Sequence, residues 1–240
     1  MKKVLIVIPT YNEHENIDPL FEDIGKHLPN AHILVVDDNS QDGTADLVKS
    51  KQLSSPGKIH LLQRKGKLGL GTAYVAGFKW GLTQGYDILI EMDADLSHDA
   101  ALLPKLVAAL DTSAVAIGSR YIAGGGTENW SLLRLAISKF GSFYARTILG
   151  MKTRDLTGGF NAWTKGILER IKLDDIKSEG YSFQIELKYR AFYLGCIILE
   201  LPFIFRERRA GQSKMSSGIV WEAMIRVWKL RAEVVKSLRP

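Results

Sequence analysis

The chain has 240 residues, of which 46% are hydrophobic and 24% charged, and its formal net charge is +6. A chain of this length and composition buries a substantial core, which excludes a wholly disordered protein. Its single cysteine, Cys196, excludes an intrachain disulfide, and we expect it to be a small buried side chain rather than a catalytic thiol.

The first half of the sequence alternates short apolar runs with helical patterns. Over residues 15–28, for example, Ile17, Leu20 and Ile24 recur on one helical face. Strands separated by helices of this length imply right-handed βαβ units and a parallel sheet. The expected strands are 3–8, 31–36, 58–63, 87–91 and 114–118, and the expected helices are 15–28, one N-capped by Asp42, 71–82 and 99–110.

The second half is less regular. It predicts helices over 131–149, 181–193 and 219–238, a strand over 196–205, a mobile loop at Gly124-Gly125-Gly126, an irregular segment over 156–164 and a polar loop over 207–218. We therefore expect a domain over 1–216 and an amphipathic helix over 217–240.

Three polar clusters follow predicted strands, at residues 9–13, 37–40 and 93–95. In an open α/β sheet, ligands bind beyond the carboxyl ends of the strands. The βαβ order brings these three ends to one edge of the sheet, so their convergence is the main functional signal in the sequence.

Asp93 and Asp95 form the carboxylate pair of Asp93-Ala94-Asp95. Mg²⁺ and Mn²⁺ prefer hard oxygen ligands, and Mg²⁺ often takes one or two carboxylates together with substrate phosphates and water. Such a metal neutralises the charge of a diphosphate leaving group. The alternative is a turn or a helix cap, but the position after a buried strand favours a metal site.

The other two clusters offer contacts for a nucleotide. One carboxylate of Asp37-Asp38 is expected to accept hydrogen bonds from a base while the other faces the sheet. Tyr11 is placed to stack on the base and Glu13 to bond the nucleoside. The glycine-containing run 67–73 resembles a phosphate loop, but a dinucleotide-binding fingerprint needs a third glycine and follows the first strand, which argues against a dehydrogenase.

The basic residues supply candidate phosphate contacts, because arginine grips phosphate in bidentate fashion. The candidates are Arg120, Arg134, Arg208 and Lys214, of which Arg120 lies just past the fifth expected strand.

Nearly all of the excess positive charge lies after Glu200. In 219–238, apolar residues including Val227, Trp228 and Leu230 alternate with basic ones. Such a helix either lies in a lipid interface, packs on the domain or docks a partner subunit. We expect neither a secretory signal nor a transmembrane helix, because the apolar runs are too short.

Together these motifs resemble the inverting family-two glycosyltransferases of GT-A fold. The resemblance begins with 7–13, 36–40, 42–44 and 92–95, and covers roughly residues 3 to 216. Within that family, the chain is most similar to the dolichol-phosphate (polyprenol-phosphate) mannose synthases. The narrower markers are 67–74, 93–98, 118–121, 155–160 and 211–214.

The resemblance implies transfer of mannose from GDP-mannose to a polyprenyl (dolichyl) phosphate, with Mg²⁺ or Mn²⁺, by an enzyme peripheral on the cytoplasmic face of a membrane. The guanosine would be held by Pro9, Tyr11, Glu13, Val36 and Asp38. The metal and diphosphate would be surrounded by Asp93, Ala94 and Asp95, with Arg208 and Lys214 closing over the phosphates. The acceptor phosphate would be received by Arg120, Arg134 and Ser138, and the catalytic residues would be Asp93, Asp95 and Arg120.

Two departures stand out. Some relatives carry Gln where this chain has Ser97, and many continue into transmembrane helices, whereas this chain looks like the short, peripheral form. A phosphate acceptor is largely ionised near neutrality, so it attacks without a protein base. Asp155 is a candidate for a base or an orienting group.

Three other functions compete with this interpretation. A polyprenyl-phosphate glucosyltransferase using UDP-glucose, or a transferase to a sugar acceptor, would share the fold. A nucleotidyltransferase would carry a glycine-rich basic loop after the first strand, where 9–13 stands instead. A nucleic-acid binder would use the basic tail but would leave the three strand-end clusters unexplained, so we expect no nucleic-acid partner.

Overall fold

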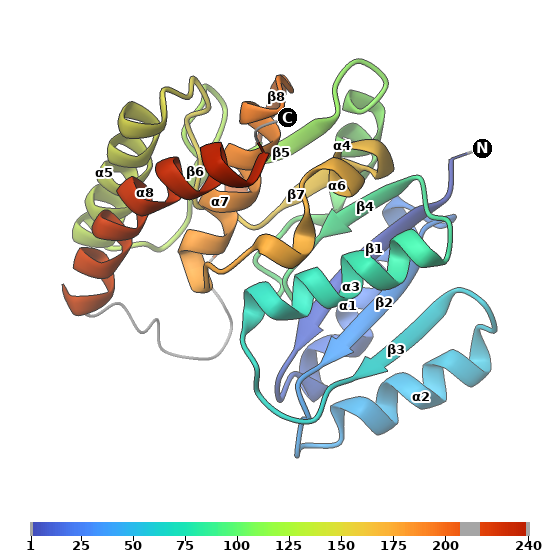
Figure 1. The fold of residues 1–240 in the computed structure, drawn as a ribbon. Coiled ribbons are helices and arrows are strands. Elements are labelled where there is room, and N and C mark those ends of the chain that lie inside the picture. The colour runs from blue at the N-terminus through green and yellow to red at the C-terminus, as the bar shows by residue number, and fades with distance from the viewer. Residues whose placement is uncertain (1, 207–216, 239–240) are drawn as a thin grey trace.

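A seven-stranded sheet crosses the part of the chain that this computed structural model describes, residues 2–206 and 217–238 (Figure 1). The strand order is β3-β2-β1-β4-β7-β5-β8. The strands are β1 (Val4–Thr10), β2 (His32–Asp37), β3 (Ile59–Gln63), β4 (Ile88–Glu91), β5 (Val115–Ser119), β7 (Asn161–Thr164) and β8 (Ile198–Pro202). The expected mostly parallel α/β sheet of GT-A type is confirmed.

Strand β7 is the antiparallel member of this sheet, between β4 and β5. The expectation of an irregular segment over 156–164 was wrong for its last four residues. They lack a repeating pattern of their own, and their conformation is fixed by ladders to both neighbours, with Asn161 opposite Glu91 on one side and Ile117 on the other. Because β7 runs backwards, its first residues lie where the parallel strands end.

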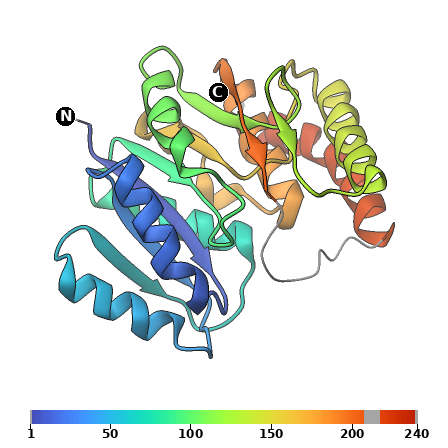
Figure 2. The same cartoon turned by 180° about the vertical axis from the view of Figure 1, so that it is seen from behind.

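Helices cover both faces of the sheet because the buried strands present apolar side chains to each side. In β1, Val4, Ile6 and Ile8 join one core and Leu5 and Val7 the other. The first core is covered by α1 (His14–His27), α2 (Thr44–Ser54) and α4 (Leu103–Ala109), which follows a short 3₁₀ turn, η1 (Ala100–Leu102) (Figure 2). The second is covered by α3 (Leu70–Thr83), α6 (Lys165–Arg170), η2 (Leu173–Asp175) and α7 (Gly180–Tyr193).

Two further helices, α5 (Leu132–Leu149) and α8 (Ser217–Leu238), lie side by side next to α7 (Figure 1). A third apolar cluster joins them and includes Ile148 from α5, Tyr189 from α7, and Leu230 and Val234 from α8. The apolar face of α8 is therefore packed on the domain, which corrects the lipid-interface interpretation for Val227 and Leu230.

Several smaller expectations need correction. The segment expected as one strand over 196–205 divides into β8 and β9 (Ile204–Phe205), and β9 pairs with β6 (Gly126–Thr127) in a second, two-stranded sheet. Gly126 therefore belongs to a strand rather than to a loop. Helix α2 follows Gly43, which has a φ of 86°, and not an N-cap on Asp42. The Asp42 carboxylate instead accepts the Thr44 amide.

Candidate active site

The three expected strand-end clusters do converge, because β1 lies between β2 and β4 in the sheet. Thr10 at the end of β1 pairs with Asp37 at the end of β2. A non-glycine residue with positive φ follows each of these strands: Asn12 (59°), Asn39 (60°) and Leu96 (62°). Such conformations are uncommon and gather at functional sites, because surrounding structure must hold them in place.

Asp93 and Asp95 sit in a turn that is held from both sides. The Tyr74 hydroxyl on α3 donates to Asp93 Oδ1 at 2.8 Å, and the Asp95 carboxylate accepts the Ser97 amide at 3.1 Å. The Asp93 amide donates to His98 Nδ1 at 3.1 Å, which leaves the proton of a neutral imidazole on Nε2, 4.0 Å from Asp93 Oδ2. His98 itself is stacked on Phe160.

Helix α3 reaches Asp93 because it lies close against the sheet. A Cβ on Gly77 would come within 2.3 Å of Val7 Cγ1, so only glycine permits this approach. Tyr74, one turn earlier in the helix, is consequently fully buried beneath the motif. Burial, together with the nearby charges of Asp93 and Glu91, raises the pKa of the Tyr74 hydroxyl, so it remains a donor.

The donor set of this turn fits a hard divalent cation. Asp93 keeps 23% of its side chain exposed, while Asp95 is buried to 9% exposure at the same edge. No group of three or more His, Cys, Asp or Glu suited to a metal is found within 2–206 and 217–238. Two carboxylates completed by substrate phosphates and water suit Mg²⁺ or Mn²⁺ better than a dedicated protein cage.

On the nucleotide side, the two carboxylates of Asp37-Asp38 have different partners. Asp37 is fully buried and accepts hydrogen bonds from Thr10 Oγ1 (2.9 Å) and the Ser40 amide (3.0 Å), so it is the one that faces the sheet. Asp38 is paired with Arg64 and accepts the Leu68 amide at 3.0 Å. Asp38 therefore anchors the glycine-containing loop, and a direct contact with a base stays a prediction.

The remaining residues expected at the donor line the same edge. Pro9 lies opposite Val36 in the β1–β2 ladder. Val36 is fully buried, so its side chain is unavailable and a ligand contact would use its backbone. Tyr11 is 38% exposed, with Lys67 Nζ 4.0 Å above its ring. Glu13 Oε2 accepts from Asn16 at 2.7 Å.

Ala94, the middle residue of the metal motif, is buried in the first core. Arg208 and Lys214, expected to close over the donor phosphates, lie outside the described residues.

Arg120 is held in a buried ion pair with Asp155. Its Nε and one terminal nitrogen donate to the two Asp155 oxygens at 2.7 Å each, and that terminal nitrogen also donates to Thr157 Oγ1 at 2.9 Å. Burial alone would raise the pKa of Asp155, but the Arg120 charge and hydrogen bonds outweigh it and hold the pKa below its ordinary value. Asp155 is therefore an ionised partner that orients Arg120.

The other two residues expected at the acceptor phosphate come from α5 and lie close to Arg120. Trp130 links the arginines, because its ring centroid lies 4.0 Å from Arg134 Cζ and 5.5 Å from Arg120 Cζ. Ser138 Oγ accepts the Tyr121 hydroxyl at 2.6 Å, and the Arg120 guanidinium lies 5.1 Å from the ring of that tyrosine. The structure thus brings Arg120, Arg134 and Ser138 into one cluster.

A buried polar network connects this cluster to the turn over residues 93–97, which carries the expected metal ligands and is called the metal turn below. Glu91, at the end of β4, accepts from Trp163 Nε1 at 2.7 Å and from Gln184, and Gln184 accepts from Asn161 at 2.8 Å. The segment that precedes β7 carries Gly159, where a Cβ would lie 3.8 Å from Asp93 Oδ2.

Lys188 on α7 completes the network by donating to the carbonyl oxygens of Leu156 and Gly158. Burial lowers the pKa of Lys188, although Asp155 and Glu91 oppose that shift. Sequence reasoning missed this function of α7. The available signal was the strict alternation of apolar and polar residues over 183–190, which on a helix puts charges on every side.

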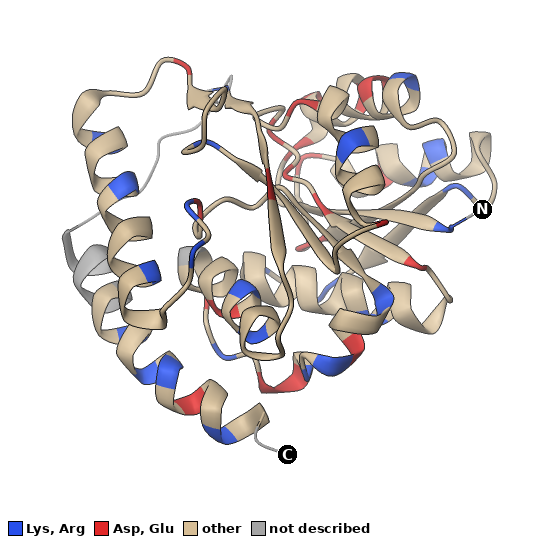
Figure 3. Cartoon of the chain, turned by 90° about the horizontal axis from the view of Figure 1, so that it is seen from above, with Lys and Arg blue, Asp and Glu red and all other residues tan. Residues whose placement is uncertain are grey.

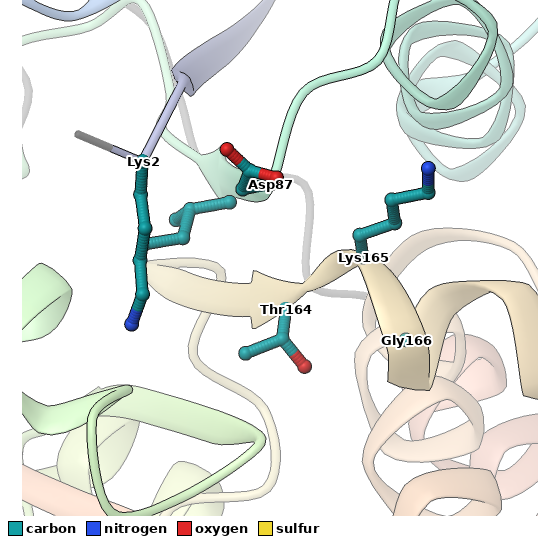
Figure 4. Close-up of a pocket in the computed structure, with 6 residues that line it drawn as sticks. Lys2, Asp87, Thr164, Lys165 and Gly166 are labelled. Atoms are coloured by element: carbon teal, nitrogen blue, oxygen red, sulfur yellow. The ribbon is translucent and has the colours of Figure 1, made fainter.

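Within the part of the chain that the structure describes, cavities lie at both ends of the sheet. One of about 420 Å³ lies beside the metal turn, between Asp95, His98 and Asp99 on one side and Pro19 and Glu22 of α1 on the other. A second, of about 450 Å³, lies at the amino end of β4, lined by residues that include Lys2, Asp87 and Lys165 (Figure 4).

The second cavity is not part of the active site. Asp87 precedes β4, whereas the metal turn follows it. Its two lysines, Lys2 and Lys165, point in different directions rather than converging on a common ligand (Figure 4).

The comparison with known families gives one match over most of the chain. The model of glycosyl transferase family 2 matches residues 5–172, which include both the metal turn and Asp155.

Curated relatives extend the match to nearly the whole chain. A polyprenol monophosphomannose synthase of Mycolicibacterium smegmatis is 44% identical over 97% of this chain and 89% of its own length. An undecaprenyl-phosphate mannosyltransferase of Micrococcus luteus is 46% identical over 96% and 95%. A dolichol-phosphate mannosyltransferase of Pyrococcus furiosus is 37% identical over 95% of this chain and 63% of its own.

Solved structures share the fold at low sequence identity. A glucosyl-3-phosphoglycerate synthase from Mycobacterium tuberculosis, in complex with UDP, aligns with a TM-score of 0.67 and 17% identity over 96% of this chain and 80% of that one. The same enzyme with Mn²⁺, UDP and phosphoglyceric acid aligns with a TM-score of 0.66 and 16% identity over 99% and 78%.

Proposed function

The chain belongs to glycosyl transferase family 2, and from this premise we propose that it transfers mannose from GDP-mannose to a polyprenyl phosphate, with inversion at the anomeric carbon. The observation that carries the proposal is the joining of a carboxylate turn and an arginine–serine cluster at one edge of the sheet. The proposal is supported by the names of the relatives at 44–46% identity.

On the donor side, the residues of this chain bind and orient. Asp93 and Asp95 would hold Mg²⁺ or Mn²⁺, which when bound neutralises the charge of the departing diphosphate. Tyr74 and His98 fix the turn that carries these carboxylates. The proposed contacts of the nucleotide remain Pro9, Tyr11, Glu13, Val36 and Asp38, together with Arg208 and Lys214.

On the acceptor side, Arg120, Arg134 and Ser138 would receive the lipid phosphate. An oxygen of this phosphate attacks the anomeric carbon, and the bond from that carbon to the diphosphate breaks. The attacking phosphate is already largely ionised near neutrality. The residues of the acceptor cluster therefore need only to position the phosphate and to balance its charge. Because both oxygens of Asp155 are bonded to Arg120, we assign it to orientation rather than to proton transfer.

A surface that contacts a membrane would suit a lipid acceptor, and exposed apolar side chains on α5 and α8 support this proposal. On α5 and α8, large apolar side chains remain exposed, at 84% for Leu132 and 57% for Trp228. Trp228 donates to the Tyr144 hydroxyl at 3.0 Å, which ties the two helices together at this face. The α5–α8 surface consists of Leu132, Leu133, Phe140, Phe143, Ile225 and Trp228.

The charges around it fit an anionic lipid headgroup layer, because bands of Lys and Arg recur along α5 and α8 (Figure 3). Within the described residues, no helix combines the length and the hydropathy that a membrane crossing requires. We therefore propose peripheral contact through α5 and α8 on the cytoplasmic face, with or without a membrane subunit.

The test is transfer of labelled mannose from GDP-mannose to undecaprenyl phosphate in detergent, with Mn²⁺ or Mg²⁺, beside UDP-glucose as donor. We expect lipid-linked mannose, and we expect it to be lost with EDTA and in Asp95→Ala. Asp111→Ala is the control, because the Asp111 side chain is 70% exposed and pairs with Lys2, away from this edge of the sheet.

Glucose transfer in place of mannose would overturn the donor assignment while keeping the family. Mannose transfer that survives EDTA and Asp95→Ala would overturn the metal site.

A further inference from the structure

The observation that prompts a further inference is a fully buried lysine on α7. Lys188 has no exposed surface, and its ammonium donates to Gly158 O at 2.6 Å and to Leu156 O at 3.2 Å. Burying a charged ammonium is costly unless it is paired and hydrogen-bonded. An apolar side chain would fill the same space without that cost, so the lysine needs a reason beyond packing.

Its two acceptors lie on either side of Thr157. Leu156 and Gly158 belong to the turn before β7, and their carbonyl groups are not part of the β7 ladders. The same turn is closed by the Gly158 amide, which donates to Asp155 Oδ1 at 3.0 Å. Lys188 therefore fixes the conformation of the turn from beneath.

This turn determines where the Arg120 guanidinium points. Asp155 and Thr157 take three hydrogen bonds from the Arg120 side chain, and Asp155 also accepts the Arg120 amide at 3.0 Å. A change of backbone conformation between 155 and 158 would move both partners of Arg120 together. The path from Lys188 to Arg120 thus consists of direct contacts.

We propose that Lys188 is a positioning residue, which locks the 155–158 turn so that Arg120 is pre-oriented for the phosphate of the lipid acceptor. The inference rests on the proposed function, because it assigns Arg120 to the acceptor. It adds a residue of α7 that does not touch either substrate. Lys188 bonds directly to the turn that holds Arg120, so the proposal assigns it to acceptor binding.

The experiment measures transfer to farnesyl phosphate, with separate KM values for acceptor and donor. In Lys188→Met we expect the acceptor KM to rise by about tenfold or more, with the donor KM unchanged within about twofold. Lys188→Arg, which keeps the charge and the donors, should recover part of the loss. Val48→Ala, at a buried residue of α2, is the control for destabilisation alone.

A double-mutant cycle decides whether the effect passes through Arg120. In an Arg120→Lys background the forked contact is already lost, so Lys188→Met should change the acceptor KM by less than about threefold. An undiminished effect in that background, or an equal rise in the donor KM, would overturn the proposal.

Thr157→Val keeps the proposal testable if Lys188→Met does not fold, because it removes one partner of Arg120 and leaves the core intact. We expect the acceptor KM to rise in this variant too, by less than about tenfold. An unchanged acceptor KM in Thr157→Val would then overturn the proposal. Wild-type protein that fails to use any polyprenyl phosphate would instead refute the proposed function itself.

Discussion

The Tyr74 hydroxyl joins α3 to the metal turn, at 2.8 Å from Asp93 Oδ1. Contacts to a metal ligand orient it, and their loss typically weakens metal binding by about 10- to 100-fold. In Tyr74→Phe we therefore expect the Mn²⁺ concentration for half-maximal activity to rise by about tenfold. An Mn²⁺ titration of transferase activity measures this.

The matched control is Tyr86→Phe. The Tyr86 hydroxyl bonds His32 at 2.8 Å, at the amino end of the sheet and away from the metal turn. The two variants should differ in metal requirement, and equal requirements would contradict the supporting role of Tyr74.

Asp155 gives a prediction for the pH dependence of stability. Its pKa is lowered in the folded protein from an ordinary value of 3.8, so its contribution is present above 3.8 and is lost as pH falls through the lower, folded value. Asp155→Asn leaves Arg120 buried without its charge partner, which costs about 3–5 kcal/mol at pH 7. Urea unfolding should show that the difference from wild type is constant between pH 7 and 5 and shrinks below 3.8.

A matched control for Asp155→Asn is Asp46→Asn, since the Asp46–Lys49 pair is exposed and contributes little. A difference between wild type and Asp155→Asn that is unchanged down to pH 3 would mean that the carboxylate charge is not what stabilises this site.

At the same scale, the proposed ligand contacts were easier to predict from the sequence than the residues that support them. Asp93, Asp95 and Arg120 follow strands, where local pattern is informative, and Arg134 and Ser138 lie in the predicted helix α5. Their supports come from distant segments: Tyr74 and Lys188 reach the site only because α3 and α7 pack on the sheet. No local sequence pattern predicts these contacts between distant segments, although the alternation of apolar and polar residues in α7 indicates charged side chains on its buried side.

Among the elements, α5 carries a prediction about lipid. Phe140 and Phe143 are 53% and 54% exposed on α5, and each contributes about 1.5–3 kcal/mol when buried in an apolar environment. The double substitution of both to Ser should lower binding to anionic vesicles by about tenfold or more, while turnover of farnesyl phosphate stays unchanged. Vesicle sedimentation measures the first and the transfer assay the second.

Leu53→Ser provides the control, because Leu53 is 82% exposed on α2, away from this surface. Equal losses of vesicle binding in both variants would place the lipid contact elsewhere.

The parallel strands and the helices between them were predictable, since each repeats a strong apolar pattern. Strand β7 was not, because its four residues take their conformation from β4 and β5 rather than from their own sequence. The sequence pattern also did not predict the division between β8 and β9, for a similar reason. Ile204–Phe205 pairs with Gly126–Thr127, a partner far away in the sequence.

For the molecule as a whole, the charge distribution predicts a dependence on salt. A basic residue near an anionic membrane surface contributes about 1 kcal/mol, and added salt screens this attraction. Binding to vesicles with phosphatidylglycerol should therefore exceed binding to neutral vesicles and fall as NaCl is raised. At a fixed NaCl concentration, Lys229→Glu on α8 should weaken binding to the anionic vesicles, whereas Lys49→Glu on α2 should leave it unchanged.

The same titration with single-stranded RNA tests the competing role of the basic segment. We expect no saturable binding at physiological salt, and RNA binding tighter than vesicle binding would assign these charges to nucleic acid.

Leu96 stands in the left-handed region, at a φ of 62°, where a leucine side chain is crowded and glycine is not. Its side chain nevertheless packs against the first core, so glycine here would relieve backbone strain of about 1–3 kcal/mol but lose that packing and add freedom to the unfolded chain. A population of variants selected only for survival at high temperature should therefore keep the leucine, and with it the strained backbone beside Asp95.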